Sequence, residues 1–217
     1  MIVLGVLTVV SIAASLLFLP AGRLDLVWFW AWLGVFAGSG TATNVLLSRF
    51  QPALLAERLR PPSDRDAATR KVAVPLLAAH LGLAGLDVGR LGWSSMPILL
   101  QLVGLCTFAA GFVLVVWTLL SNPFASSAVR IQTERAQTVI SSGPYGLVRH
   151  PMYLAVVFVC LGSGPALGSW LAAPVLWPVI LVFVRRTLIE DRMLHDELAG
   201  YAAYAGTVRW RVIPGVF

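Results

Sequence analysis

The sequence is poor in charged residues. Only 12% of its 217 residues are Asp, Glu, Lys or Arg, whereas 58% are hydrophobic, and the mean hydropathy is +0.83. Because a soluble domain carries about a quarter charged residues, this composition excludes an ordinary soluble fold and indicates a polytopic membrane protein. The net charge of +6 does not point to nucleic acid, since the basic residues stand in loops between apolar runs. We therefore expect no nucleic-acid partner and assign these residues to the membrane surface, beside the lipids.

Residues that bind metals are also scarce. The two cysteines, Cys106 and Cys160, stand in separate apolar segments without CxxC spacing, so we interpret them as small core residues. The three histidines are scattered, and we expect no metal site. A lone His80 in an apolar segment is more often packed and hydrogen-bonded than a ligand. The sequence also lacks a P-loop, an HExxH motif and a plausible Ser-His-Asp set.

Apolar segments are abundant, and they predict an all-α fold. We expect a polytopic membrane protein with five to six transmembrane helices, the last two forming a tilted or partly re-entrant hairpin, because each of its arms is short for a span of ~20 residues. The first segment lacks a basic start and is interpreted as a retained span. A turn is expected at residues 87–90, and a C-terminal amphipathic helix from Arg185 to about Ala205. The predicted apolar segments are 2–19, 26–47, 72–86, 97–120, 151–162 and 169–184.

The distribution of Arg and Lys predicts the topology. Six of the 16 basic residues lie in the loop 49–71, three in the loop 121–150 and five in the tail from residue 185. Only Arg23 and Arg90 lie in the opposite loops. By the positive-inside rule, six segments with both termini in the cytoplasm bring the two long loops and the tail to one face.

A polar, turn-rich stretch at residues 141–153, which we call the cassette, interrupts the apolar pattern. Gly143-Pro144 breaks the chain, and Arg149-His150 stands directly before Pro151. Proline fits the first turn of a helix and pushes the preceding residue out of the α region, so His150 is expected just outside a helix N-terminus. A helix start beside an arginine can bind an anion. The alternative is a positively charged anchor at the membrane boundary.

Two further polar groups are expected on the same face. One is the segment 130–140 before the cassette. The other contains Arg186 and Glu190, which are four residues apart and share a helix face. They either form a surface ion pair, worth only ~0.3–0.5 kcal/mol, or line a cavity where the helix leaves the bilayer.

These motifs resemble the isoprenylcysteine carboxyl methyltransferase family, which is related to the membrane phospholipid N-methyltransferases. The resemblance rests on Gly-Pro-Tyr-x-x-Val-Arg-His-Pro-x-Tyr at 143–153 and Arg-x-x-x-Glu-Asp-x-x-Leu at 186–194, followed by Tyr-x-x-Tyr and Ile-Pro-Gly. Residues 54–61 and Asn122-Pro123-Phe124 also resemble its bacterial branch. The resemblance implies N-terminal transmembrane helices in residues 1–120 and a methyltransferase catalytic region in 121–217.

The resemblance further implies S-adenosylmethionine as cofactor and a lipophilic carboxylate, such as an isoprenylcysteine, entering from the bilayer. It implies a bacterial inner-membrane protein with a cytoplasmic active site. Arg186 would face the acceptor carboxylate and Glu190 the methionine amino group. The other implied cofactor-binding residues are Gln132, Gln137, Thr138, Val139, Ile140, Tyr145, His150, Pro151, Met152 and Tyr153.

Some residues depart from the family pattern, and other functions stay open. Ala136 stands where a Gly is frequent, and Thr207 where many members carry Arg, a role that Arg209 could take. The acceptor could instead be a phospholipid amine or a small thiol. Sterol-type reductases that use NADPH carry a similar hairpin, but this chain has Met152 in place of their Asn and lacks their acid. A membrane scaffold or transporter is a third class, although charged residues are absent from the first, second and fourth apolar segments.

Overall fold

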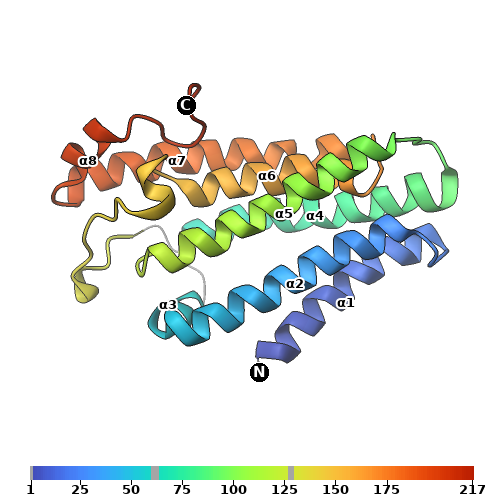
Figure 1. The fold of residues 1–217 in the computed structure, drawn as a ribbon, viewed down its shortest axis with the longest axis horizontal. Coiled ribbons are helices and arrows are strands. Elements are labelled where there is room, and N and C mark those ends of the chain that lie inside the picture. Colours follow the sequence, from blue (N-terminus) through green and yellow to red (C-terminus); the bar gives the residue numbers. More distant parts are fainter. Residues whose placement is uncertain (1, 60–63, 127–129) are drawn as a thin grey trace.

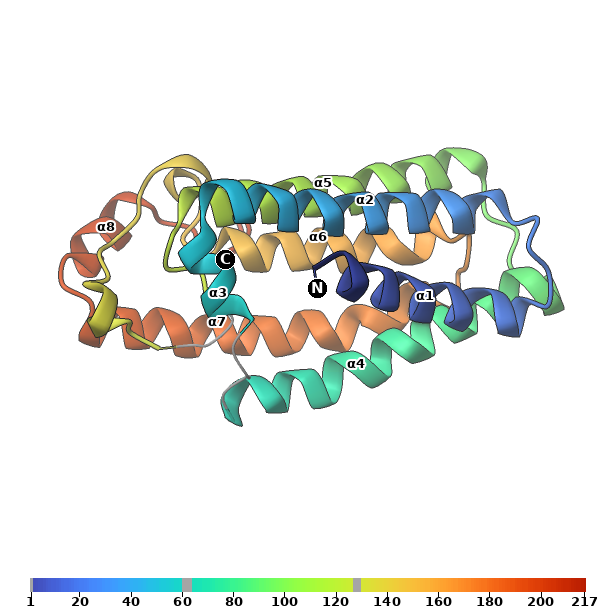
Figure 2. The same cartoon turned by 90° about the horizontal axis from the view of Figure 1, so that it is seen from below.

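The computed structural model describes residues 2–59, 64–126 and 130–217, with no side chains described for 2–3 and 64–68. Of the predicted positive loop, Arg60 to Ser63 lie outside this part. Long helices run side by side along the long axis of the molecule (Figures 1 and 2). The described part contains helices and turns and no β-strand, which confirms the all-α prediction. The helices are α1 (Ile2–Ala21), α2 (Val27–Phe50), α3 (Pro52–Arg58), α4 (Asp64–Ala84), a π-helical segment (Gly85–Leu91), α5 (Ile98–Ser121), α6 (Pro151–Ala166), α7 (Trp177–Glu197) and α8 (Tyr201–Thr207).

Close helix packing in the bundle depends on small residues. Helices α5 and α6 meet where Gly104 faces Ala166 and Gly162 faces Phe108. A methyl group added to either glycine would lie 2.5 Å from a backbone nitrogen of the other helix, so only glycine permits this approach. The core beside this contact is mostly apolar and includes the buried Phe29 and Trp32.

One buried polar cluster joins three helices within the bundle. His80 of α4 is fully buried, with Nδ1 at 2.9 Å from the Ala172 carbonyl oxygen and Nε2 at 2.8 Å from Ser163 Oγ. The Trp32 indole of α2 donates to the same hydroxyl at 2.9 Å. His80 is therefore packed and hydrogen-bonded, as its position in the sequence predicts.

The expected turn at residues 87–90 is wrong. Helix α4 continues through these residues as the π-helical segment and ends at Gly92, which has φ +62°. The segment lies directly against α1, because Gly85 and Gly89 have no side chains to clash with Leu17 and Ala21. The local turn signal is overridden by packing between helices.

Two other predictions need correction. A separate amphipathic helix was expected from Arg185, but α7 continues through this position to Glu197 because no residue there breaks the helix. Gly200, with φ +83°, then separates α7 from the short α8. Cys160 is buried as expected, whereas Cys106 lies on the outer surface of α5 and not in the core.

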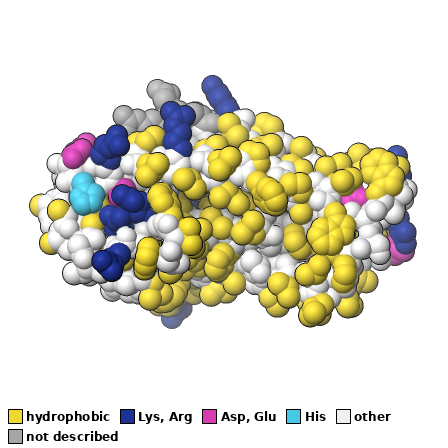
Figure 3. Space-filling model, turned by 90° about the horizontal axis from the view of Figure 1, so that it is seen from above, with side chains coloured by type: hydrophobic (Ala, Val, Ile, Leu, Met, Phe, Trp, Pro, Cys, Tyr) yellow, Lys and Arg dark blue, Asp and Glu magenta, His cyan; other side chains and the backbone are white. Residues whose placement is uncertain are grey.

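The surface is apolar along the middle of the molecule. Hydrophobic side chains cover this region in Figure 3, and the charged side chains gather towards the two ends. By length and composition, three helical stretches of the described chain could cross a membrane: Leu4–Ala21, Thr69–Leu91 and Ile98–Ser121. Helix α6 is apolar but shorter. The chain is thus built as an integral membrane protein, while the count of five to six spans stays a prediction.

The predicted topology can be tested with single cysteines in a Cys106→Ser background. Ser141 belongs to the cassette, and Ser95 is an exposed residue in the connection between the π-helical segment and α5, at the other end of the bundle. We expect Ser141→Cys to react with a membrane-impermeant maleimide only from the cytoplasmic side and Ser95→Cys only from the outside. Labelling of Ser141→Cys in intact cells would contradict the topology.

Candidate functional site

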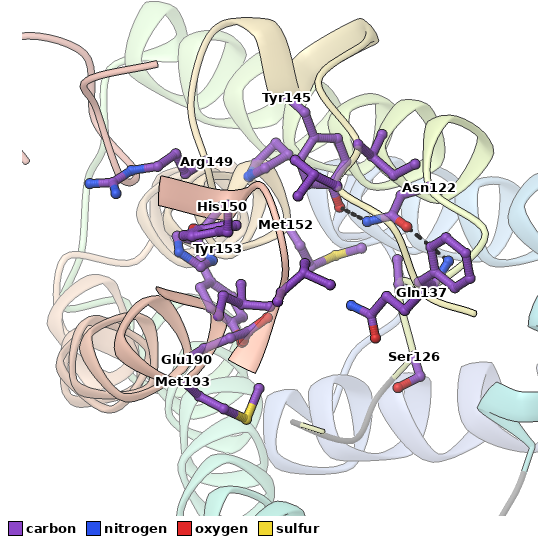
Figure 4. A pocket seen from close by; sticks show the side chains of 18 of the residues that line it. Asn122, Ser126, Gln137, Tyr145, Arg149, His150, Met152, Tyr153, Glu190 and Met193 are labelled. Atoms are coloured by element: carbon purple, nitrogen blue, oxygen red, sulfur yellow. Dashed lines mark hydrogen bonds between the residues drawn. The ribbon is translucent and has the colours of Figure 1, made fainter. Parts of the chain in front are cut away.

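A cavity of about 320 Å³ opens at the charged end of the bundle (Figure 4). It lies where the C-terminal end of α5, the cassette, α3 and the second half of α7 meet. Segments far apart in the sequence thus form its walls. The predicted site residues that line it are Gln137, Thr138, Val139, Ile140, Tyr145, His150, Pro151, Met152, Tyr153, Arg186 and Glu190.

Gln132 is the predicted site residue that does not line the cavity. Its side chain is almost fully buried, donates to the Phe124 carbonyl at 2.7 Å and accepts from Arg135 at 2.7 Å. Its backbone N–H donates to the Gln137 side chain at 2.8 Å. Gln132 therefore shapes the loop and holds Gln137 in place, because all its polar groups are used within the loop.

The cassette turns sharply before α6. Gly143 has φ +59°, and a Cβ there would lie 2.5 Å from Ser121 Oγ on α5, so this position requires glycine. His150 has φ −126° and ψ 65°, and Pro151 occupies the first turn of α6. This confirms the expected helix start.

Tyr153 connects the two charged residues of α7 that face the cavity. Its hydroxyl donates to Glu190 Oε2 and accepts from Arg186 Nε at 3.0 Å. The Tyr153 ring stacks on the His150 ring at 5.6 Å between centroids. Arg186 and Glu190 are therefore part of a cavity wall shared by α6 and α7, and an isolated surface ion pair does not describe them.

Asp191, the residue after Glu190, lies on another face of α7 and is almost fully buried. Its Oδ1 accepts from the Tyr201 hydroxyl at 2.8 Å and lies 3.1 Å from Arg149 Nη1 and 3.3 Å from His150 Nε2. Its Oδ2 accepts from Arg211 Nε at 2.9 Å. One carboxylate thus joins α7, α8, the cassette and the C-terminal tail.

The partners of Asp191 decide its charge state. Burial acts to raise its pKa, but the hydrogen bonds from His150, Arg211 and Tyr201, together with the charge of Arg149, hold the pKa of this carboxyl well below its usual range. Because a carboxylate only accepts hydrogen bonds, His150 carries a hydrogen on Nε2 in this arrangement. The backbone supports the same contact, since Arg149 and His150 donate to the carbonyls of Trp210 and Arg211 at 2.9 and 2.8 Å.

Tyr145 occupies another wall of the cavity. Its hydroxyl accepts from Asn122 Nδ2 at 2.9 Å (Figure 4). Its carbonyl oxygen accepts from the Tyr204 hydroxyl at 2.7 Å. Burial raises the pKa of Tyr145 well above its usual value, and the charge of Glu190 acts in the same direction. The phenol is therefore neutral and can still donate one hydrogen bond into the cavity.

Several lining residues received no role from the sequence. Arg58 and the segment after α5 belong to the family pattern, but the sequence assigned them no role, because no local feature predicts that they lie beside the cassette. The apolar residues of α7 look like ordinary packing in the sequence, and the α8 tyrosines entered the family pattern without an assigned role. Arg149 was expected to bind an anion at the helix start, and in the structure it pairs with Asp191. The lining residues that were missed are Arg58, Asn122, Phe124, Ala125, Ser126, Arg130, Val156, Phe183, Met193, Leu194, Leu198, Tyr201 and Tyr204.

The departures from the family pattern have different structural settings. Ala136 has φ +49°, in the left-handed region that favours glycine, which agrees with the frequent Gly at this position. Thr207 donates to the Tyr204 carbonyl at the end of α8. Neither Thr207 nor Arg209 lines the cavity, so Arg209 does not supply the missing arginine there.

Replacing Asp191 by Asn tests its structural role. Asp191→Asn should lower the free energy of unfolding by about 3–5 kcal/mol, since it leaves Arg149 buried without its counter-charge. Because the pKa of Asp191 is lowered in the folded state, its stabilisation should be fully present above pH ~4 and be lost as the pH falls through the lowered value. Denaturant titration in detergent measures both effects.

The matched control is Asp196→Asn, an exposed acid on the same helix. Equal stabilities of the two variants would contradict a central role for Asp191.

The region that contains the site is similar to known proteins. Residues 99–199 match the family model described as phospholipid methyltransferase, a stretch that contains the cassette, α6 and the Arg186–Glu190–Asp191 group. A relative from Cupriavidus metallidurans, named "Cobalt-zinc-cadmium resistance protein CzcN", is 28% identical over 169 residues, which cover 75% of this chain and 71% of the relative. The predicted relationship to the membrane methyltransferases is thereby confirmed for residues 99–199, which carry the phospholipid methyltransferase pattern.

Proposed function

We propose that the protein is a membrane methyltransferase that uses S-adenosylmethionine to methylate the carboxylate of a lipophilic acceptor similar to an isoprenylcysteine. The observation that carries the proposal is the single cavity shared by residues 137–140, the cassette and Glu190. The resemblance assigns these three segments to the cofactor on the basis of sequence alone. Their meeting in one cavity, inside the region that matches the family model, supports that assignment.

The chemical groups of the cavity fit this cofactor. Glu190 offers a carboxylate to an ammonium group, and Gln137 offers an amide to a polar ring edge. Tyr145 and Tyr153 supply aromatic faces, which attract cationic groups such as a sulfonium. Residues 138–140 also line the cavity. The set thus contains a partner for each charged or aromatic part of the cofactor except its carboxylate.

The proposed reaction requires little acid–base catalysis by the protein. S-Adenosylmethionine supplies an activated methyl group, and a carboxylate acceptor is already ionised at neutral pH. The protein then has to align the two reactants and exclude water. Arg186, held by the Tyr153 hydroxyl at 3.0 Å, would orient the carboxylate.

The apolar side of the cavity supports a lipophilic acceptor. Met152 and Val156 of α6 and Phe183 of α7 give the cavity apolar lining beside its charged residues. An acceptor with a hydrocarbon chain would enter here from the bilayer. In our proposal the site faces the cytoplasm at a bacterial inner membrane, as the positive-inside rule predicts from the basic loops.

A phospholipid amine is the second candidate acceptor, favoured by the description of the matching family model. An amine loses a proton when it is methylated, so this reaction would need a base. The carboxylate of Glu190, which lines the cavity, could accept that proton. The reductase alternative has less support, because the matched model describes methyltransferases. Methylation assays with a prenylated cysteine and with phosphatidylethanolamine distinguish the two acceptors.

Substitutions at Glu190 and Arg186 test the proposal. Glu190→Gln removes the charge for the amino group and should raise the Kd of S-adenosylhomocysteine about ten- to hundredfold. Arg186→Ala should leave this Kd nearly unchanged and lower the methylation rate with a carboxylate acceptor. Arg186→Lys should restore part of the rate, since an ammonium cannot reproduce the guanidinium fork. Calorimetry and a radiolabelled methyl-transfer assay measure the two quantities.

The matched controls lie on the same helix. Glu197→Gln and Arg185→Ala change exposed charges of α7 outside the cavity lining and should alter neither quantity. Equal and small effects of all five variants would reject the assignment of Arg186 and Glu190 to the site.

A further inference from the structure

The cavity contains an arginine for which neither the motifs nor the proposed reaction supplies a role. Arg58 lies at the end of α3 and lines the cavity, and its side chain is half-buried. Its Nη1 donates to the Ala125 carbonyl at 2.8 Å. Burial lowers the pKa of the Arg58 guanidinium, which means that the cavity disfavours its charge.

The other arginines of the cavity lie beside acids. Arg130 contacts Glu57 at 2.8 Å and Glu134 at 2.6 Å, and Arg149 contacts Asp191 at 3.1 Å. Arg186 shares the Tyr153 hydroxyl with Glu190. For Arg58, by contrast, the described residues provide a carbonyl and no carboxylate partner. A half-buried cation in this position is stabilised when a ligand supplies an anion.

Helix α3 holds Arg58 firmly at the cavity. Leu54 is fully buried and packs with Leu47 of α2 and Leu119 of α5. On the same helix, Glu57 accepts from Arg130 across the loop that follows α5. The position of Arg58 is therefore fixed by the apolar packing of Leu54 and the ion pair of Glu57, both earlier in the same helix, so Arg58 can act as a preorganised binding group.

Tyr145 lines the cavity together with two opposite charges, Glu190 and Arg58. Burial raises the pKa of Tyr145, the charge of Glu190 acts in the same direction, and the charge of Arg58 lowers it. A carboxylate and a guanidinium in one cavity suit a ligand that carries both an ammonium and a carboxylate group. The residues assigned above to the proposed cofactor leave its carboxylate without a partner, and Arg58 is the lining arginine for which the described residues provide no acid.

We propose that Arg58 binds the carboxylate of the cofactor's amino-acid moiety, while Glu190 binds its ammonium group. This inference rests on the proposed function and adds a residue from the N-terminal half of the chain to the cofactor site. Arg186 is then left for the acceptor, and the two arginines have separate ligands.

The test compares three ligands: S-adenosylhomocysteine, its decarboxylated analogue, and methylthioadenosine, which lacks the whole amino-acid moiety. Wild-type protein in detergent should bind S-adenosylhomocysteine about ten- to hundredfold more tightly than the decarboxylated analogue. Arg58→Gln should abolish this preference by weakening S-adenosylhomocysteine alone. Glu190→Gln should weaken both of the ligands that keep the amine. Binding of methylthioadenosine should be the same in all variants.

Controls separate binding from folding. Arg49→Gln removes an exposed arginine at the end of α2 and should leave every affinity unchanged. Arg58→Lys keeps the charge and should retain part of the preference, even if Arg58→Gln does not fold. An equal loss of affinity for S-adenosylhomocysteine and its decarboxylated analogue in Arg58→Gln would show a structural role and overturn the inference.

Two other results would also overturn it. Unchanged binding of all ligands together with a raised KM for the acceptor would assign Arg58 to the acceptor while leaving the proposed function intact. Failure of the wild-type protein to bind S-adenosylhomocysteine at all would reject the proposed function and the inference together.

Discussion

The buried carboxylate of Asp191 is the contact on which the site depends. It accepts from Tyr201 and Arg211 and pairs with Arg149, so α7, α8, the cassette and the tail are tied to one point. A buried charge is tolerated only when it is fully paired, and the pairs then fix the geometry of their partners. In this protein the geometry that is fixed includes the His150 ring at the cavity wall.

Two neighbouring acids of α7 therefore have different tasks. Successive residues of a helix point about 100° apart, so Glu190 reaches the cavity while Asp191 reaches the tail. The structural acid positions the cassette, and the cassette supplies Tyr153, whose hydroxyl contacts Glu190 and Arg186. The stability of the fold and the proposed chemistry are coupled through these few hydrogen bonds, because each polar side chain is held in position by a hydrogen bond to another one.

The apolar bundle explains why the site is at one end. Glycines such as Gly104 and Gly162 bring α5 and α6 into close contact and leave little space between them. Polar ligands cannot be accommodated in such a core without unpaired groups. The cavity opens where the helices give way to the cassette and α3, and there a polar ligand and an apolar chain can meet.

The sequence by itself determined the class of protein, the start of α6 at Pro151 and the shared face of Arg186 and Glu190, because hydropathy, proline geometry and helical periodicity are local properties. Through the family resemblance it also indicated 11 of the 25 residues that line the cavity. Only the tertiary structure decided that Gln132 supports the loop, that Asp191 binds four partners and that Arg58 reaches the cavity from α3. It likewise replaced the turn at residues 87–90 by a π-helical segment packed on α1. These features depend on contacts between segments far apart in the chain, and no local pattern specifies such contacts.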